Sequence, residues 1–472
     1  MFHICAGASA APHRMSTRGK DSRAMQFDAM KENNWLDLMS DTARDLFLPQ
    51  GIFYWSGRAG KEADINATIG TAAGWESDII PGGKSDKWIT YYIPSVREKM
   101  RQIPSDNVFP YAPILGLPGF RKAWREWIVK KTTPHFPFDA DLLGSPMVVP
   151  GASPGLFYLV KMFLSPGEAL VCPDKRWENY DLMFTDCLGV PIESYPFFEN
   201  AKPAPENLEK KLVEVAKKQD KLVTMLNFPN NPTGYMPSRA EGEAYRDAIV
   251  NAANATGKTV VVLFDDAYDG YVFDETGAPI SIFGMFVGLH PNVLPVKVDG
   301  VSKELLWYGG RTACITFAFH PDLRNRAALE KEVENKVGAL VRGTVSNSVR
   351  LVQEAVSLAL ADPDTVFAER KVVEQVLSAR CAALKHSLKS LDPKAAYPEP
   401  FNSGFFCLLN VNPAVDADAL ADHLLKQYRT GVIPMKDAAL GINAIRVAFC
   451  SVDAPHVAAL VDAIGKGIAD LS

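Results

Sequence analysis

Apolar runs that end in glycine- or proline-containing turns recur through the middle of the chain. Six runs predict strands, at residues 147–149, 169–172, 222–226, 259–264, 293–298 and 313–319. Several are apolar at nearly every position, which is typical of strands covered on both faces. Helical patterns stand beside them at 120–130, at 156–164 and after Ser238, where Glu241 completes a capping-box pattern. This alternation predicts an α/β fold with a mostly parallel sheet flanked by helices.

The two ends of the chain have other patterns. Residues 26–100 mix short helical patterns with Gly- and Pro-rich loops and predict no clean sheet, apart from a short strand-like run at 65–70. From 320 onward the pattern is helical, with a long helix at 364–391. Strand patterns at 405–411 and 444–450 and helical patterns at 416–427 and 454–470 then close the chain. We therefore predict a smaller α+β domain built from the N- and C-terminal segments.

The expected divisions of the chain follow from these patterns. They are a leader at 1–25, an N-terminal arm with part of the small domain at 26–104, a large domain at 105–345, and a linker helix with the small C-terminal domain at 346–472. The leader is rich in Ala, Ser and basic side chains. This composition favours a disordered segment and leaves an organellar transit peptide as the alternative.

Composition narrows the class of protein. With 47% hydrophobic and 22% charged residues and a formal net charge of −5, the chain has no basic stripe that would bind nucleic acid. It has no apolar run long enough to span a bilayer. Its seven cysteines and eight histidines are scattered without metal-ligand spacing. We expect a cytoplasmic protein with reduced cysteines and no metal site.

Polar side chains follow four of the predicted strands: Ser153, Asn231, Asp265 and Lys303. Ligands of open α/β sheets collect beyond the carboxyl ends of the strands, so we expect these groups in one site. A neutral lysine amine can condense with an aldehyde cofactor, and an arginine placed soon after it, Arg311, can hold a phosphate. Each residue also has an ordinary alternative, because most lysines are solvated and Asn-Pro-Thr-Gly is a good turn sequence.

Three motifs together resemble a known family. Asn231-Pro-Thr-Gly234, Asp265-x-Ala-Tyr268, and Ser302-Lys303 followed by Arg311 are similar to the motifs of class I pyridoxal-phosphate (PLP) aminotransferases of fold type I, in the aspartate and aromatic branch. The order and the Lys-to-Arg spacing match, and the resemblance runs from about 65 to 446. It implies transfer of an amino group between an L-amino acid of aspartate or aromatic type and a 2-oxo acid such as 2-oxoglutarate, by a ping-pong reaction through pyridoxamine phosphate.

The resemblance implies roles for the residues around the cofactor ring. Lys303 would hold the cofactor as a Schiff base and then act as the base that moves the α-proton. Asp265 would pair with the pyridine nitrogen. The ordinary alternative is that Asp265 or Asp266 caps a turn, which suits Asp266 better than an aspartate at a sheet end. Asn231 and Tyr268 would donate hydrogen bonds to the phenolate oxygen of the ring.

The phosphate site is implied in the same way. Arg311 and Ser302 would bind the phosphate, helped by the turn formed by Gly151, Ala152 and Ser153 at the start of a helix. One position departs from the family, because Gly300 stands where a phosphate-binding serine is usual. Another donor or a water would have to replace it.

Two aromatic residues extend the implied site. Trp177 matches the aromatic residue that stacks on the cofactor ring, although a plain core tryptophan is the alternative. Tyr111 matches a tyrosine that reaches the phosphate of the neighbouring subunit. That match implies a homodimer with shared active sites.

Substrate binding is implied for five residues: Arg446, Asn231, Gly70, Trp177 and Arg342. Arg446 matches the bidentate clamp of the α-carboxylate, and Gly70 is expected over the substrate side chain. Arg342 matches an arginine that the partner subunit supplies to a distal carboxylate, although a surface ion pair is its ordinary alternative.

Two other functions share these residues. A PLP-dependent lyase, decarboxylase or cyclase would use the same lysine and the same fold. A non-catalytic ligand sensor would need a DNA-binding segment that the chain does not show. Arg342 favours the transferase, because a lyase has less need of a second carboxylate site.

Overall fold

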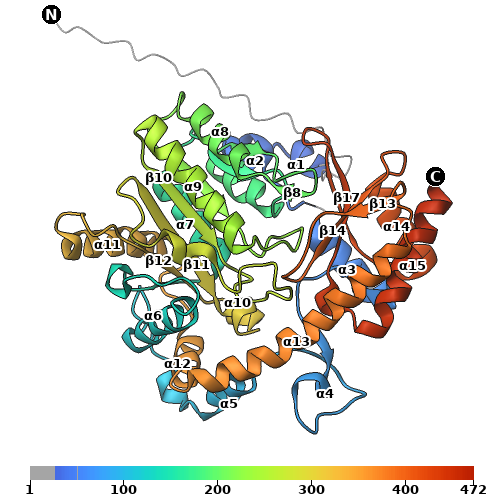
Figure 1. Cartoon of the computed structure of the whole chain (residues 1–472), viewed down its shortest axis with the longest axis horizontal. Coiled ribbons are helices and arrows are strands. Elements are labelled where there is room, and N and C mark those ends of the chain that lie inside the picture. The colour runs from blue at the N-terminus through green and yellow to red at the C-terminus, as the bar shows by residue number, and fades with distance from the viewer. Residues whose placement is uncertain (1–26, 50) are drawn as a thin grey trace, which may run out of the picture.

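The computed structural model describes residues 27–49 and 51–472, so the predicted leader at 1–25 lies outside the described residues. Two sheets, each with its own helices, form two lobes that lie beside each other in Figure 1. The larger lobe carries a sheet of seven strands and the smaller lobe a sheet of four. Together they give the predicted α/β fold with a smaller α+β part.

The large sheet is mostly parallel, as predicted. In spatial order its strands are β4 (Met147–Val149), β12 (Ala313–Phe317), β11 (Val293–Gly300), β10 (Val260–Asp265), β9 (Leu222–Leu226), β5 (Leu170–Pro173) and β6 (Ile192–Tyr195). Only β12 runs antiparallel to its neighbours, β11 and β4. The six predicted strands are all present, whereas the edge strand β6 has no counterpart in the prediction because its Ile-Glu-Ser-Tyr sequence is half polar.

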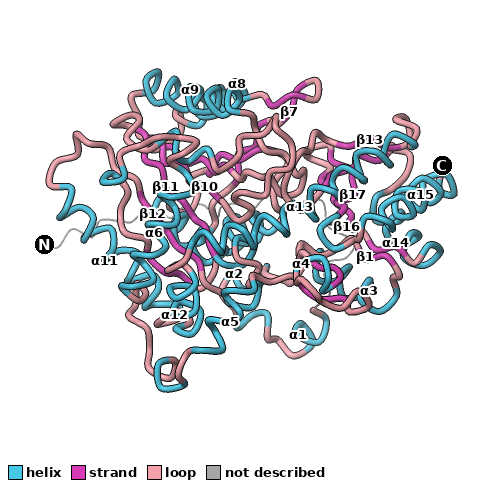
Figure 2. The backbone as a smooth tube through the Cα atoms, turned by 60° about the horizontal axis from the view of Figure 1, so that its bottom comes forward, coloured by secondary structure: helices cyan, strands magenta, loops and turns pink. Residues whose placement is uncertain are grey.

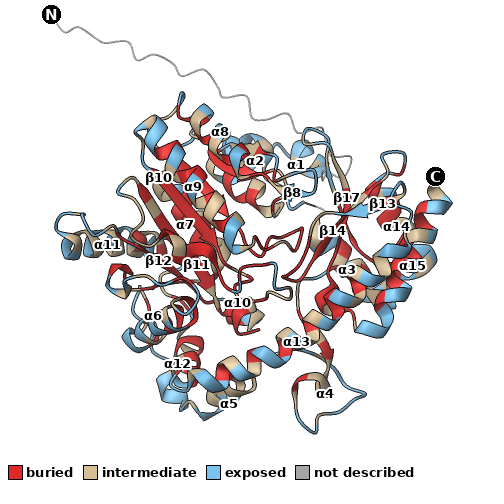
Figure 3. Cartoon of the chain, in the orientation of Figure 1, coloured by how far each residue is buried: buried red, intermediate tan, exposed pale blue. Residues whose placement is uncertain are grey.

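Both faces of this sheet are covered, which explains its continuous apolar runs. Along β10, Val260, Val262 and Phe264 join the core on one face, and Val261 and Leu263 join the core on the other. Figure 3 shows the central strands buried along their length. The first face is covered by α6 (Pro118–Thr132), α8 (Pro205–Val215), α9 (Arg239–Thr256) and α12 (Arg350–Ala359), and the second by α7 (Ala152–Phe163) and α11 (Arg326–Thr344).

The capping box predicted before α9 is present. The Ser238 hydroxyl accepts a hydrogen bond from the Glu241 backbone N–H at 3.2 Å, and the Glu241 carboxylate accepts one from the Ser238 N–H at 2.7 Å. This arrangement satisfies two backbone donors at the helix start.

The small lobe joins both ends of the chain, as predicted. Its antiparallel sheet has the order β13 (Ala396–Pro398), β14 (Cys407–Val411), β17 (Ile442–Val447) and β16 (Ile433–Asp437). The short β1 (Ile65–Asn66) pairs in parallel with β15 (Thr430–Gly431) and brings the N-terminal segment to this lobe. Figure 2 shows these strands together at one end of the molecule, with α3 (Ile52–Glu62), α14 (Ala417–Tyr428) and α15 (Ala454–Leu471) around them.

One long helix, α13 (Pro363–Ser387), connects the lobes and runs in Figure 1 from the region of α12 to that of α15. It ends four residues before the predicted limit of 391, because 388–390 form a 3₁₀ turn. The remaining elements are α1 (Asp28–Glu32), α2 (Asp41–Asp45), α4 (Glu76–Ile79), α5 (Pro94–Gln102), α10 (Val301–Glu304) and the short strands β2 (Ala73–Trp75), β3 (Trp88–Thr90), β7 (Phe198–Glu199) and β8 (Lys202–Pro203). None of the described helices is both long and apolar enough to cross a membrane.

Candidate active site

The predicted site residues gather at one edge of the large sheet. Asn231 follows β9, Asp265 ends β10, and Lys303 follows β11, so parallel pairing brings all three loops to the same edge. Arg311 reaches that edge too, because β12 is antiparallel and begins where its neighbours end. The topology therefore turns four separate stretches of sequence into one site.

Lys303 lies in α10, a single helical turn directly after β11. The Tyr271 hydroxyl donates to the backbone carbonyl of Lys303 at 2.9 Å, and Lys303 Nζ lies 5.4 Å from the centre of the Tyr268 ring. Burial lowers the pKa of Lys303, Asp265 opposes that shift, and Arg311 and Arg446 add to it. The surroundings thus favour the neutral amine that nucleophilic and base chemistry require.

Asp265 is a buried carboxylate that three neighbours orient. Tyr180 donates its hydroxyl to Asp265 Oδ2, and the Ala267 N–H donates to Oδ1 at 3.3 Å. The Asn227 side-chain amide holds the Asp265 carbonyl at 2.8 Å. Burial raises the pKa of Asp265, while the Tyr180 hydrogen bond and the Lys303 charge act to lower it. A cationic ring nitrogen placed against this carboxylate would keep it ionised.

Two residues beside Asp265 differ from expectation. Tyr180 received no role from the sequence, although it lies three residues after Trp177, at the start of the helical segment that follows β5. Turn capping, the ordinary alternative for Asp266, is not what its side chain does: the buried carboxylate pairs with Lys297 Nζ and accepts a hydrogen bond from the Ser281 hydroxyl at 2.7 Å. It faces away from the site, into a group of buried charges described below.

Arg446 comes from β17 of the small lobe and closes the site from the opposite side. Its Nη1 donates to Asn231 Oδ1 at 3.2 Å and its Nη2 to the Thr68 carbonyl at 2.8 Å. The guanidinium lies 4.3 Å from the centre of the Phe406 ring. Burial lowers the pKa of Arg446, and its Nε has no hydrogen-bond partner among the described residues. A carboxylate ligand would satisfy both the charge and this donor.

An anion cradle lies at the start of α7. Gly151 has a φ of 118°, and a Cβ there would stand 2.4 Å from Arg311 Nη2, so only glycine allows this approach. Arg311 Nη1 donates to the Ser302 hydroxyl at 3.3 Å. Ala152 and Ser153 form the first turn of α7, whose free N–H groups favour an anion. The predicted phosphate residues thus meet in space.

Packing against β12 explains why position 300 is a glycine and not a serine. A Cβ at this position would lie 2.6 Å from the Cβ of Ala313 and 2.7 Å from the carbonyl oxygen of Thr312. A serine side chain does not fit against β12 here. Ser302, two residues later, is the hydroxyl that accompanies Arg311.

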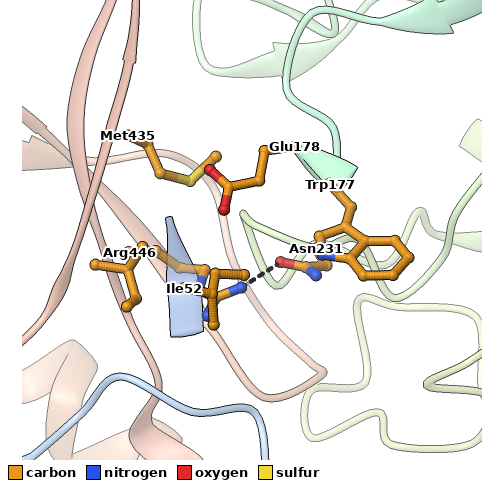
Figure 4. Close-up of a pocket in the computed structure, with 7 residues that line it drawn as sticks. Ile52, Trp177, Glu178, Asn231, Met435 and Arg446 are labelled. Atoms are coloured by element: carbon orange, nitrogen blue, oxygen red, sulfur yellow. Dashed lines mark hydrogen bonds between the residues drawn. The ribbon is translucent and has the colours of Figure 1, made fainter. Parts of the chain in front are cut away.

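A pocket beside the site, drawn in Figure 4, joins the two lobes. It is lined by Ile52, Trp177, Glu178, Asn231, Ile433, Met435 and Arg446. Trp177 meets Tyr180 edge to face, with ring centres 5.6 Å apart. Gly70 lies close by, since a Cβ there would be 2.5 Å from Phe406 and 3.6 Å from the Tyr268 hydroxyl. Sequence reasoning missed the contributions of α3 and β16.

Tyr111 and Arg342 lie outside this group. The Tyr111 side chain is 85% exposed, and its backbone carbonyl accepts from Arg350 Nη1 at 3.3 Å. Arg342 is exposed on α11, where its Nη1 donates to the Ser346 hydroxyl. Both were predicted to act in a neighbouring subunit, and in the single chain both lie on the surface, apart from the other site residues.

Comparison with known proteins identifies the chain's relatives. A family model described as aminotransferase class I and II matches residues 85–464. The chain belongs to this family. Among the relatives, it is 22% identical over 315 residues to the cytoplasmic aspartate aminotransferase of Schizosaccharomyces pombe, covering 65% of this chain and 72% of that protein. It is 26% identical over 302 residues to the aspartate/prephenate aminotransferase of Cereibacter sphaeroides, covering 61% and 68%.

A solved structure supports the same fold. The aminotransferase of Anaerococcus prevotii superposes with a TM-score of 0.76 at 21% identity, covering 91% of this chain and 98% of that one. The chain is therefore a PLP-dependent class I aminotransferase of fold type I. None of these relatives is named as a lyase, and the lyase alternative gains no support.

The residues of this aminotransferase fit its cofactor. A buried carboxylate, Asp265, is available to the ring nitrogen, and Lys303 is available to the aldehyde carbon. The cradle of Gly151, Ser302 and Arg311 suits the phosphate. No group of three His, Cys, Asp or Glu residues within 27–49 and 51–472 is arranged to hold a metal ion.

Proposed function

We propose that the enzyme moves an amino group between an L-amino acid of aspartate or aromatic type and a 2-oxo acid such as 2-oxoglutarate. The observation that carries this proposal is the buried Arg446, which donates a hydrogen bond to Asn231 at the sheet edge that also bears Lys303. A guanidinium at this place gives every substrate the same α-carboxylate anchor and leaves its α-carbon near the amine. Relatives named for aspartate and prephenate support the donor class.

The residues around the cofactor ring can then be assigned to the proton transfers and charges of this reaction. Bound PLP supplies an electron-withdrawing ring and an aldehyde that accepts the amino group. Lys303 would hold the cofactor through Nζ and would serve as the base for the substrate's α-proton. Asp265, oriented by Tyr180, would pair with the ring nitrogen and favour its protonated form. Asn231 and Tyr268 would donate hydrogen bonds to the phenolate oxygen.

The remaining roles concern orientation. Arg311, Ser302 and the turn 151–153 would bind the phosphate. Trp177 would cover the ring face, and Arg446 would clamp the α-carboxylate with Asn231 beside it. Gly70, which packs closely against Phe406, would lie over the substrate side chain. These assignments come from the resemblance of the motifs, and the gathering of Asn231, Asp265, Lys303 and Arg311 at one edge of the large sheet supports them.

We further propose a cytoplasmic homodimer with shared active sites. Exposed apolar side chains support it, since Phe109 and Tyr111 are 84% and 85% exposed. Val345 and Val349 are also exposed, and Asn347 between them donates to the carbonyl of Ala112, next to Tyr111. Tyr111 would reach the partner's phosphate, and Arg342 would reach a distal carboxylate of the partner's substrate. A relative named as cytoplasmic supports the location.

A half-reaction tests the proposed activity. Single amino acids are added to the purified holoenzyme while the visible absorbance band of the lysine-bound cofactor is followed. Loss of that band with gain of the pyridoxamine spectrum, reversed by 2-oxoglutarate, is expected for aspartate or an aromatic donor. Lys303→Ala should lack the band altogether. Release of ammonia or pyruvate without a pyridoxamine form would instead identify a lyase.

A further inference from the structure

The helix that carries Lys303 cannot hold itself in place. α10 has only four residues, and its N-cap, Gly300, offers no side chain. One isolated turn of helix is unstable because a single hydrogen bond does not offset the ordering of its residues. The position of Lys303 must therefore be set by contacts from other elements.

Glu304, the residue next to Lys303, supplies such contacts. Its side chain is fully buried, and its Oε1 accepts from Trp127 Nε1 at 2.5 Å and pairs with Lys131 Nζ. Arg370 Nη1 lies 3.9 Å from the same oxygen. Trp127 and Lys131 belong to α6 and Arg370 belongs to α13, so two long helices anchor the short one.

Glu304 is part of a larger group, which we call the buried charge cluster. It consists of Asp266, Asp269, Asp299, Glu304, Lys131, Lys297 and Arg370. Lys131 Nζ lies 2.9 Å from Asp269 and 3.7 Å from Asp299, and Lys297 Nζ lies 3.0 Å from Asp269 and 3.8 Å from Asp299. Arg370 donates to the Asp269 carbonyl at 2.9 Å.

The cluster is tied to the active site through the chain itself. Asp266 follows Asp265, Asp269 follows Tyr268, and Glu304 follows Lys303. On each loop one residue faces the site and its neighbour faces the cluster. Movement of a cluster carboxylate therefore moves a site residue.

Stability alone is a weak reason for such a group. Replacing buried ion pairs by packed apolar side chains often leaves a protein as stable or more so. Fixing the geometry of the site is a stronger reason for the cluster, because a displacement of about 1 Å at a reacting group can lower a rate by about 100-fold.

We propose that Lys131 and Glu304 are positioning residues for Lys303: their buried ion pair, together with Trp127 and Arg370, fixes α10 and so aims the lysine amine. This inference rests on the proposed role of Lys303 in proton transfer. Neither residue touches substrate or cofactor, and both act through the backbone of α10.

Glu304→Gln is the main test, because glutamine keeps the volume and the acceptor for Trp127 and removes the charge opposite Lys131. We expect kcat to fall at least 10-fold with the KM of the amino donor within about 3-fold. An α-deuterated donor should show a larger kinetic isotope effect than in the wild type, since a misplaced base slows proton removal. In the resting holoenzyme, the pH midpoint of the visible band should shift, a readout that needs no turnover.

Other variants separate position from charge and from folding. Glu304→Asp keeps the charge but shortens the anchor, and we expect the same increase in isotope effect. Lys131→Arg should recover most of the activity that Lys131→Met loses, because arginine keeps the cation. The matched control is Glu334→Gln, which removes the partner of Arg121, a residue of α6 outside the buried charge cluster, and should change none of these quantities.

The outcomes are distinct. If Glu304→Gln lowers the melting temperature yet keeps the wild-type isotope effect and band titration, the cluster is structural only and the inference is wrong. If wild type forms no pyridoxamine with any donor, the proposed function fails. Even then, an unchanged band titration in Glu304→Gln and Glu304→Asp would overturn the inference, and a shifted one would support it.

Discussion

Gly300 is a residue whose identity is set by a neighbouring strand and not by its own backbone. Its backbone is extended, with φ 179°, so any residue could adopt the conformation, but Ala313 and Thr312 leave no room for a Cβ. The family's usual serine is excluded here by packing. The hydroxyl beside Arg311 comes from Ser302 instead.

We therefore predict that Gly300→Ser destabilises the enzyme. Overpacking against Ala313 should lower the free energy of unfolding by about 1–3 kcal/mol, measured by urea denaturation. Gly309→Ser, in the same loop with nothing within 4 Å of its Cβ position, is the control and should change it by less than about 0.5 kcal/mol. Equal effects of the two substitutions would contradict the packing explanation.

The lowered pKa of Lys303 predicts a pH-dependent stability change. Below its ordinary pKa of 10.5 the unfolded lysine is charged, while burial and two arginines favour the neutral amine in the folded apoenzyme. This difference costs stability as pH falls from 10.5 toward the lowered pKa, by up to about 1.4 kcal/mol per pH unit. Below the lowered pKa the cost is constant.

Lys303→Met removes the titrating group. The stability of the mutant apoenzyme relative to wild type should therefore increase as pH falls through that window, in urea titrations at several pH values. Lys122→Met, at a lysine with 78% side-chain exposure, should show no such trend. A stability difference that stays constant with pH would refute the desolvation argument.

The site residues that stand in motifs could be predicted from the sequence to act together. The residues that hydrogen-bond to them and orient them could not. Lys303, Asp265 and Asn231 stand in recognisable sequences at strand ends, and the sheet brings them together. Tyr180 supports Asp265 only because β5 and β10 end at the same edge, with β9 between them. No local spacing relates residues that are 85 positions apart.

At the scale of elements, the turn between β4 and α7 requires a glycine at position 151. Gly151→Ala would place a methyl group 2.4 Å from Arg311 Nη2 and strain a φ of 118°. We expect at least 10-fold weaker PLP binding, measured by titrating the apoenzyme and following fluorescence. Gly57→Ala, in α3 with nothing within 4 Å, should bind PLP as wild type does. Retained affinity in Gly151→Ala would show that the cradle is not formed by this turn.

Strands buried on both faces were predictable, and half-buried ones were not. β9 and β10 are apolar at nearly every position, so their limits were found within one residue. β6 and β16 mix polar and apolar side chains at sheet edges, where one face needs no apolar cover. The predicted strand at 444–450 begins two residues late and ends three residues late, the latter because Phe449 and Cys450 are buried in a 3₁₀ turn.

At the scale of the whole molecule, Arg380 on α13 holds the lobes together. It is 2% exposed, and its Nη1 donates to the carbonyls of Ala73 at 2.7 Å and Cys450 at 2.5 Å. Its Nη2 donates to the Tyr91 hydroxyl at 2.9 Å. Ala73 and Tyr91 are hundreds of residues away from Cys450 in the sequence, so no local sequence pattern predicts that Arg380 contacts all three.

We expect Arg380→Met to lower the free energy of unfolding by about 3–5 kcal/mol, because it leaves several buried acceptors without their donor. Arg380→Lys should restore part of this loss. Chemical denaturation of the apoenzyme measures both, and Arg58→Met, at a partly exposed ion pair of α3, should cost less than about 1 kcal/mol. A small effect at Arg380 would show that the lobes are held mainly by apolar packing.

The pocket beside the site has a consequence for evolution. Three of its wall residues, Ile52, Ile433 and Met435, come from α3 and β16, whereas Lys303 and Asp265 stand on the large sheet and are held by buried partners behind them. Mutations that reshape the walls therefore leave the chemistry intact. A duplicated gene could drift toward a new amino donor while each intermediate still bound its cofactor, so donor preference is expected to diverge faster among descendants than the transamination reaction itself.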